Sequence, residues 1–149
     1  MMALAALRST HDRLAAWLAT LVPQDLLALA ARFGIGAIFW QSGRTKVEGV
    51  IAVTDGAIDL FREEFRLPLI DPVVAAHMAA YAETLFPMLL FLGLFTRLSA
   101  AALLCMTLVI QVFVYPDAWP THLGWAAIFL YLVRHGAGRV SLDHLLHLR

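Results

Sequence analysis

The stretch AAHMAAYAETLFPMLLFLGLF, residues 75–95, decides the fold class of this chain. It is almost wholly apolar, and its length matches the ~20 residues that a transmembrane helix needs. Glu83 lies near its centre, where a carboxylate facing lipid is costly. Such a carboxylate must be protonated or find a partner among neighbouring helices. The stretch therefore predicts a buried polar contact inside a bundle of membrane helices.

The composition of the whole chain agrees with a membrane protein. Of its 149 residues, 61% are apolar and 15% are charged, and the mean hydropathy is +0.77. Soluble domains contain about 45–50% apolar and about 25% charged residues, and a small one cannot bury this excess. The net charge is zero without a basic stripe, which argues against nucleic-acid binding. We expect one domain over residues 1–149, with the lipid bilayer as its main partner.

Four apolar segments predict transmembrane helices, at residues 26–44, 73–95, 98–115 and 120–134. The fourth is shorter than the usual range of about 17–25 residues. Together they predict an all-α fold, a transmembrane four-helix bundle. Arg and Lys are more frequent in the terminal segments and the second loop than in the first and third loops. This bias predicts that both termini lie in the cytoplasm.

Amphipathic segments flank these spans. A helix before the first span would carry a leucine face at the membrane surface, formed by Leu7, Leu14, Leu18 and Leu21. In the first loop, TDGAIDLFREEFRLPLI (residues 54–70) places Ile58, Phe61 and Phe65 on one helical face. This pattern predicts a short interfacial helix that covers the outer side of the bundle. A short amphipathic segment is also expected at the C-terminus.

Arg32, in the first span, is the partner that we predict for Glu83. A rise of 1.5 Å per residue places both side chains at similar depths in a core about 30 Å thick, and a guanidinium matches a carboxylate in shape. The pair could be a static contact between helices. It could also bind a polar substrate, tune a cofactor or relay a proton. Pro87 leaves the carbonyl of Glu83 without its usual helical donor.

A second polar level is predicted near the outer ends of the four spans. Its members are Ser42, Lys46, His77, Tyr81, Gln111, Trp119, His122 and Trp125. Individually, Lys, Tyr and Trp are common anchors at the membrane interface. Together these residues predict a small polar pocket with an aromatic wall, open to the outside. Small aromatic or quinone-like head groups would suit it.

Three segments resemble the DoxX family of small four-helix membrane proteins: RFGIGAIFWQSGRTKVEG (32–49), AETLFPMLLFLGLFTRLSA (82–100) and GAGRVSLD (136–143). The family's motif positions fall on Arg32, Gly43, Lys46, Glu83, Gly93 to Arg97 and Gly138 to Asp143. The block MTLVIQVFVYPDAWPTHLGWA (106–126) is similar to a subset found beside enzymes and precursors of modified, metal-handling peptides. The resemblance implies an integral protein of the bacterial cytoplasmic (inner) membrane.

The resemblance implies a membrane subunit of a redox system, quinone-linked and acting with a partner protein or as a homo-oligomer. The alternative is a non-catalytic accessory protein in metal or oxidative stress or in modified-peptide biosynthesis. A small-solute transporter ranks third, because four spans without an inverted repeat are few for alternating access. Cys105 is the only cysteine, which excludes a CxxC redox pair. A quinone is the favoured cofactor, a haem on His77 and His122 is disfavoured, and no metal site is predicted.

Overall fold

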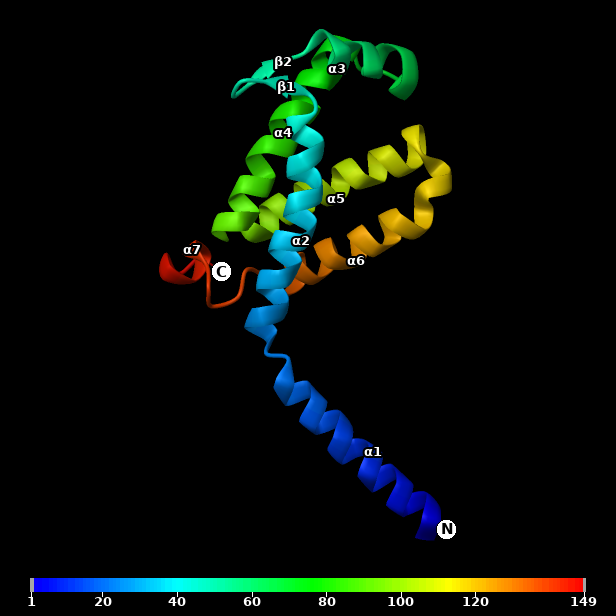
Figure 1. The fold of residues 1–149 in the computed structure, drawn as a ribbon, viewed down its shortest axis with the longest axis vertical. Helices are drawn as coiled ribbons and strands as arrows, with labels where there is room; N and C mark the ends of the chain where they lie inside the picture. Colours follow the sequence, from blue (N-terminus) through cyan, green and yellow to red (C-terminus); the bar gives the residue numbers. More distant parts are fainter. Residues whose placement is uncertain (1, 149) are drawn as a thin grey trace.

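The computed structural model describes residues 2–148, with side chains for Arg8 and for all residues from Thr10 onward. Figure 1 shows a chain built from five long helices, α1 (Met2–Leu21), α2 (Gln24–Arg44), α4 (Pro72–Leu92), α5 (Thr96–Val109) and α6 (Trp119–His135). The prediction of a helical fold is confirmed. The one departure from it among the described residues is a hairpin of two two-residue strands.

Three helical segments of the described chain are long and apolar enough to cross a membrane. They are Gln24–Arg44, Pro72–Leu92 and Thr96–Val114, which agree with the first three predicted spans. The third continues α5 through a π-helical turn, η2 (Ile110–Val114). The fourth predicted span is a helix, α6, but its 17 residues leave it outside this set.

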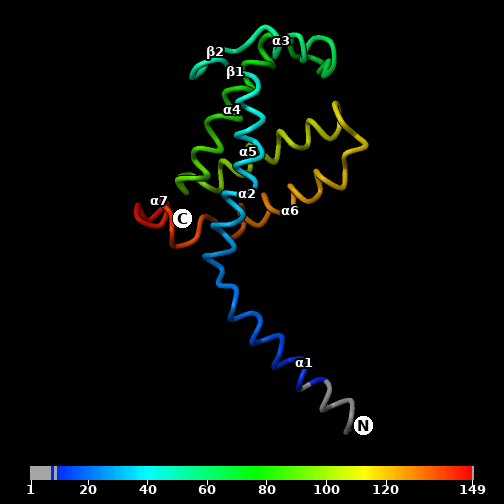
Figure 2. The backbone as a smooth tube through the Cα atoms, in the orientation of Figure 1, coloured from blue at the N-terminus to red at the C-terminus, as the bar shows by residue number. Residues whose placement is uncertain are grey.

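Helix α1 projects away from the other helices (Figures 1 and 2). Pro23 separates it from α2 and occupies the N-cap of α2. Leu14, Trp17, Leu18 and Leu21 of α1 are each about half exposed. Leu14, Leu18 and Leu21 belong to the predicted amphipathic face, and the side chain of its fourth member, Leu7, lies outside the described residues.

Helices α2, α4, α5 and α6 share one apolar core. Helix α2 packs mainly along α4, and α5 packs mainly along α6. The core residues are Ile35, Phe39, Leu90, Ala100, Leu103, Phe129 and Leu132. We call the end where α2 and α5 begin and α4 and α6 finish the tail end, because the C-terminal tail lies there. The opposite end is the loop end (Figure 1).

Glycine lets α2 and α4 approach closely. A Cβ atom at Gly43 would lie 2.9 Å from the carbonyl oxygen of Glu83, closer than real contacts allow. That carbonyl is the one that Pro87 leaves without a helical donor. Small residues at such crossings are the usual means of close packing between membrane helices. The backbone around Glu83 is therefore held directly against α2.

The first loop folds over the loop end. Strands β1 (Val47–Glu48) and β2 (Ala52–Val53) form an antiparallel hairpin. Helix α3 (Asp55–Leu60) follows, capped by the Thr54 hydroxyl, and continues as a π-helical turn, η1 (Phe61–Phe65). Phe61 is buried against α4. The predicted helix in this loop is thus present, whereas the hairpin was not foreseen.

The remaining short elements lie at opposite ends of the bundle. A 3-10 turn, η3 (Pro116–Ala118), connects α5 to α6 at the loop end. Helix α7 (Leu142–Leu145) belongs to the tail that follows α6. The tail returns to the starts of α2 and α5, as Figure 2 shows.

Candidate functional site

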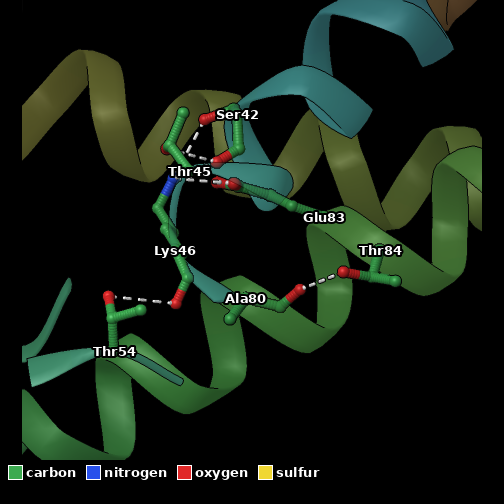
Figure 3. Close-up of polar contacts among 7 residues, drawn as sticks. All are labelled: Ser42, Thr45, Lys46, Thr54, Ala80, Glu83 and Thr84. Carbon is green, nitrogen blue, oxygen red and sulfur yellow. Dashed lines mark hydrogen bonds and ion pairs between the residues drawn. The ribbon is translucent and has the colours of Figure 1, made fainter. Parts of the chain in front are cut away.

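A buried ion pair joins the end of α2 to the middle of α4. The Nζ atom of Lys46 lies 2.7 Å from Oε2 of Glu83, and both side chains are less than one-tenth exposed. Lys46 Nζ also donates to the hydroxyl of Ser42 at 2.9 Å and to its carbonyl at 3.2 Å. Figure 3 shows these three contacts converging on the ammonium group. Each of its three protons therefore has an acceptor.

The first loop fixes the position of Lys46. The amide of Lys46 donates to the carbonyl of Gly43 at the end of α2. The carbonyl of Lys46 accepts from the amide of Thr54 at 3.0 Å. The next residue, Val47, pairs with Val53 in the β hairpin. These contacts turn the chain back over the bundle, so that the Lys46 side chain points toward α4 (Figure 3).

The predicted pair between Arg32 and Glu83 is wrong. Arg32 is buried, but its guanidinium donates to four main-chain carbonyls, those of Leu90, Phe91, Ala137 and Val140, at 2.7–2.9 Å. Leu90 and Phe91 belong to the last turn of α4, where carbonyls lack the usual helical donor four residues later. The Leu90 carbonyl also accepts from the amide of Gly93 at 3.1 Å. Ala137 and Val140 belong to the tail. Arg32 therefore closes one helix end and anchors the tail.

Asp143 completes this anchor at the tail end. Its two carboxylate oxygens accept from the amides of Phe95 and Thr96, at 2.7 and 2.9 Å, and so cap the start of α5. The amide of Asp143 in turn donates to the carbonyl of Gly93. A carboxylate also interacts favourably with the N-terminal end of a helix dipole. Arg32 and Asp143 thus both fasten the tail to the helices at this end.

The Lys46–Glu83 pair lies in the wall of a cavity of about 140 Å³. Polar groups from Ser42, Lys46, Glu83 and His122 meet apolar and aromatic side chains there. The other lining residues are Ile38, Phe39, Phe65, Ile110, Tyr115 and Trp125. Four predicted pocket residues, Ser42, Lys46, His122 and Trp125, therefore come together.

His122 is oriented by Gln111. The amide nitrogen of Gln111 donates to the carbonyl of Pro116 at 2.7 Å, which fixes the orientation of the side chain. Its Oε1 atom consequently faces His122 Nδ1 at 2.6 Å, and Nδ1 must carry the proton of that hydrogen bond. In the neutral ring, Nε2 of His122 is then an acceptor. Gln111 thus belongs to the site through His122.

Four predicted pocket residues do not line this cavity: Gln111, which reaches the site through His122, and also His77, Tyr81 and Trp119. His77 bonds through Nδ1 to the carbonyl of Val73 in its own helix and packs its ring against Tyr81. Tyr81 is 45% exposed and Trp119 is 60% exposed. Helical spacing predicts His77, Tyr81 and Trp119 at the same end of the bundle as Lys46, but none of the three lines the cavity. They fit the alternative interpretation of interface anchors.

Five lining residues were missed in the sequence, namely Ile38, Phe39, Ile110, Phe65 and Tyr115. The last two join separate parts of the chain. The Tyr115 hydroxyl donates to the Glu64 carboxylate, and the rings of Phe65 and Tyr115 meet edge to face at 5.8 Å between centroids. The hydrogen bond to Glu64 raises the pKa of Tyr115 above its ordinary value. We call Glu64, Phe65 and Tyr115 the lid contact, because they join the first loop to the α5–α6 connection beside the cavity. The aromatic face of the first loop was the available signal for Phe65.

The arrangement can hold a small polar aromatic molecule. The ammonium group can donate to a ligand in place of one of its Ser42 acceptors, Nε2 of His122 can accept a hydrogen bond, and Glu83 keeps a compensating charge next to Lys46. Aromatic rings form the opposite wall, where Trp125 also packs against His122 with centroids 5.2 Å apart. Pockets with apolar walls and a few placed polar groups are typical of small-molecule sites.

Comparison with known proteins gives a family but not a reaction. A curated protein of Haemophilus influenzae, described as an uncharacterized protein, is 29% identical over 128 residues, which cover 79% of this chain and 82% of the relative. No solved structure matches the chain. The DoxX family model matches residues 27–116, a range that includes Arg32, Lys46 and Glu83. With this match over more than half of its length and with helices able to cross a bilayer, the chain is an integral membrane protein and belongs to the DoxX family.

Proposed function

We propose that this chain is the membrane subunit of a quinone-linked redox system and binds the quinone ring in the cavity beside Lys46 and Glu83. The observation that carries the proposal is the position of the ion pair, which forms part of a cavity wall. Buried charges in membrane proteins commonly mark sites for substrates, ions or protons. A partner protein would exchange electrons with the bound ring.

The size of the cavity supports a single-ring ligand. Its volume of about 140 Å³ is close to that of an engineered cavity of about 150 Å³ that holds benzene. The aromatic side chains of Phe39, Phe65 and Trp125 offer surfaces on which a flat ring can pack. Ring substituents and an isoprenoid tail would have to leave through the open side of the cavity.

The polar groups support a ligand with carbonyl oxygens. A bound quinone would supply the two-electron acceptor, and its oxygens would need hydrogen-bond donors. Lys46 is a charged donor oriented by Ser42 and Glu83, and a quinone oxygen would take the place of one of its two Ser42 acceptors. Glu83 stabilises the ammonium form of Lys46 in an environment where an unpaired charge is costly. His122, held by Gln111, is a second group able to accept or deliver a proton.

We further propose that α6 also spans the bilayer, which completes a four-helix bundle with both termini in the cytoplasm of a bacterium. Its 17 residues correspond to about 26 Å of helix, near the thickness of a thin hydrocarbon core. In this orientation the lid contact and the cavity face outward, and the tail faces the cytoplasm.

The test is to look for bound quinone in protein purified gently from its native membrane. We expect the wild type and the control Arg44→Gln to release about one quinone per chain on solvent extraction, identified by mass. Arg44 lies near the site in sequence, but its side chain is exposed and donates to the carbonyl of Gly49 in the adjacent loop. Lys46→Met should lose the quinone while the helical circular dichroism signal is retained.

A folded wild type without quinone would reject the redox proposal. The second candidate would then be a non-catalytic accessory protein in stress response or in modified-peptide biosynthesis. The exposed apolar face of α1 favours it, because Trp17 and Leu18 offer a surface for a partner protein or for the bilayer. Co-purification of a stoichiometric partner that is lost when residues 1–21 are deleted would support this alternative.

A further inference from the structure

A second hollow lies at the tail end, far from the Lys46–Glu83 cavity. It has a volume of about 650 Å³, and the starts of α2 and α5, the end of α6 and the tail contribute its walls. Its charged and polar lining includes Arg97, Arg139, His135 and His144. Neither proposed function makes use of this pocket.

Arg97 has no acceptor for its guanidinium among the residues whose side chains the structure describes. Its side chain makes no hydrogen bond or ion pair within residues 2–148, although the Gly136 backbone passes close to its guanidinium. Arg139 is 82% exposed, and its Nε atom is 3.8 Å from a carboxylate oxygen of Asp25. Both guanidinium groups are therefore available to a ligand that carries negative charge.

The two carboxylates in the same pocket are already engaged with backbone amides. Asp143 accepts from the amides of Phe95 and Thr96. Asp25 accepts from the amide of Arg139 at 2.8 Å. Their charges are partly offset by these donors and by the start of α5. The available partners in the pocket are thus its cations.

The pocket also adjoins the lipid-facing surface. Arg97 is the second residue of the candidate span Thr96–Val114, so it lies at the depth of lipid headgroups. Next to it, Phe95 is 51% exposed and Leu98 is 66% exposed. A ligand there would meet guanidinium groups and apolar side chains together, which matches a phospholipid.

We infer that this pocket binds the phosphate group of an anionic phospholipid, held by Arg97 and Arg139 with the acyl chains along Phe95 and Leu98. Basic pockets between membrane helices are known to hold such headgroups. Each arginine should contribute about a five-fold increase in affinity, the usual effect of one basic residue at a membrane surface.

The experiment measures lipid adducts by native mass spectrometry and melting temperature in detergent. The ligands are phosphatidylglycerol, zwitterionic phosphatidylcholine and inorganic phosphate. The variants are Arg97→Gln, Arg139→Gln and the charge-retaining Arg97→Lys, with Arg62→Gln as the matched control. Arg62 is exposed at the loop end, where it pairs with Asp59.

We expect phosphatidylglycerol to bind and stabilise the wild type, Arg62→Gln and Arg97→Lys. We expect it to bind Arg97→Gln and Arg139→Gln about five-fold more weakly than the wild type. Equal binding of phosphatidylglycerol and phosphatidylcholine would overturn the inference. Retained affinity in both Gln variants would overturn it as well. Equal stabilisation by inorganic phosphate would assign the pocket to a free anion and exclude the lipid.

Discussion

Two buried cations, Arg32 and Lys46, lie near opposite ends of α2 and are satisfied in different ways. Arg32 gives its hydrogen bonds to four main-chain carbonyls. Lys46 gives its hydrogen bonds to Glu83 and Ser42, next to a cavity. Backbone carbonyls cannot change charge, so the Arg32 contact serves only to hold segments together. A carboxylate and a hydroxyl can respond to a ligand or a proton, so the Lys46 contact can be part of a mechanism.

The largest effect in this comparison should come from Arg32→Met. The substitution leaves four carbonyls at the tail end without their donor and releases the tail, so we expect a loss of about 4 kcal/mol. Denaturant titration in detergent would measure the loss of stability. Limited proteolysis would show faster cleavage on the C-terminal side of Ala137, in the released tail. Exposed Arg134 supplies a control as Arg134→Met. A change below about 1 kcal/mol would contradict the anchoring role of Arg32.

Lys46→Met and Glu83→Gln test the other cation. Each single substitution removes one partner of a buried pair and should cost about 3 kcal/mol. The double variant should cost clearly less than the sum, because neither residue is then left as an unpaired charge. The same denaturant titration gives all three values. Additive losses would show that the two side chains do not interact in the membrane.

Gly43→Ala tests the close approach that brings Glu83 to α2. The new Cβ would collide with the Glu83 backbone, so we expect a loss of about 1–3 kcal/mol. Gly34 is the matched control, since a Cβ there meets nothing within 4 Å. Gly34→Ala should be neutral or stabilising by up to about 1 kcal/mol. Equal effects at the two positions would contradict the tight crossing at Gly43.

Asp143→Ala isolates one part of the tail anchor. It removes the cap from the amides of Phe95 and Thr96 but leaves Arg32 with its carbonyls, so a loss of about 1 kcal/mol is expected. Thermal unfolding in detergent provides the measurement. Asp55→Ala serves as the control, because Thr54 supplies the side-chain cap of α3. A loss as large as that of Arg32→Met would mean that the aspartate, and not the arginine, holds the tail.

The smallest effect should appear at the lid contact and only at alkaline pH. The Tyr115 pKa is raised by its hydrogen bond to Glu64, so this bond stabilises the fold below the ordinary tyrosine pKa of about 10. The stabilisation is lost as the pH rises through the raised pKa. Tyr115→Phe should remove this alkaline loss from the pH profile of the melting temperature. Tyr81→Phe is the control, and a profile unchanged by Tyr115→Phe would contradict the contact.

The sequence was sufficient for the helices but not for the pairing of their charges. Arg32 was predicted as the partner of Glu83 because both residues lie at similar depths in the membrane. Those depths were estimated from the rise per residue along straight helices. This estimate of depth did not include the C-terminal tail. The tail residues that accept from Arg32, Ala137 and Val140, follow it in the sequence by 105 and 108 positions. The estimate also did not include the hairpin after α2, which turns Lys46 back toward α4.

The structure brings four of the predicted pocket residues together in one cavity at the loop end. Ser42, Lys46, His122 and Trp125 face inward because α2 and α6 turn those positions toward the core. His77 and Tyr81 share a face of α4 that points away from it. Rotation of a helix about its axis depends on packing, and a weak amphipathic pattern in an apolar helix leaves it undetermined. Tyr115 was missed because its position beside the cavity depends on the path of the α5–α6 connection, which helical spacing does not predict.

The long sequence separation between Arg32 and its tail acceptors has a consequence for biosynthesis. Arg32 enters the membrane with the first span, but Ala137 and Val140 are synthesised more than a hundred residues later. At about 5–20 residues per second, that interval is roughly 5–20 s. Throughout it, the guanidinium has half of its final acceptors at most. The first span can therefore reach its final environment only when the last residues leave the ribosome, so nascent chains that stop before the tail should remain substrates for membrane quality control.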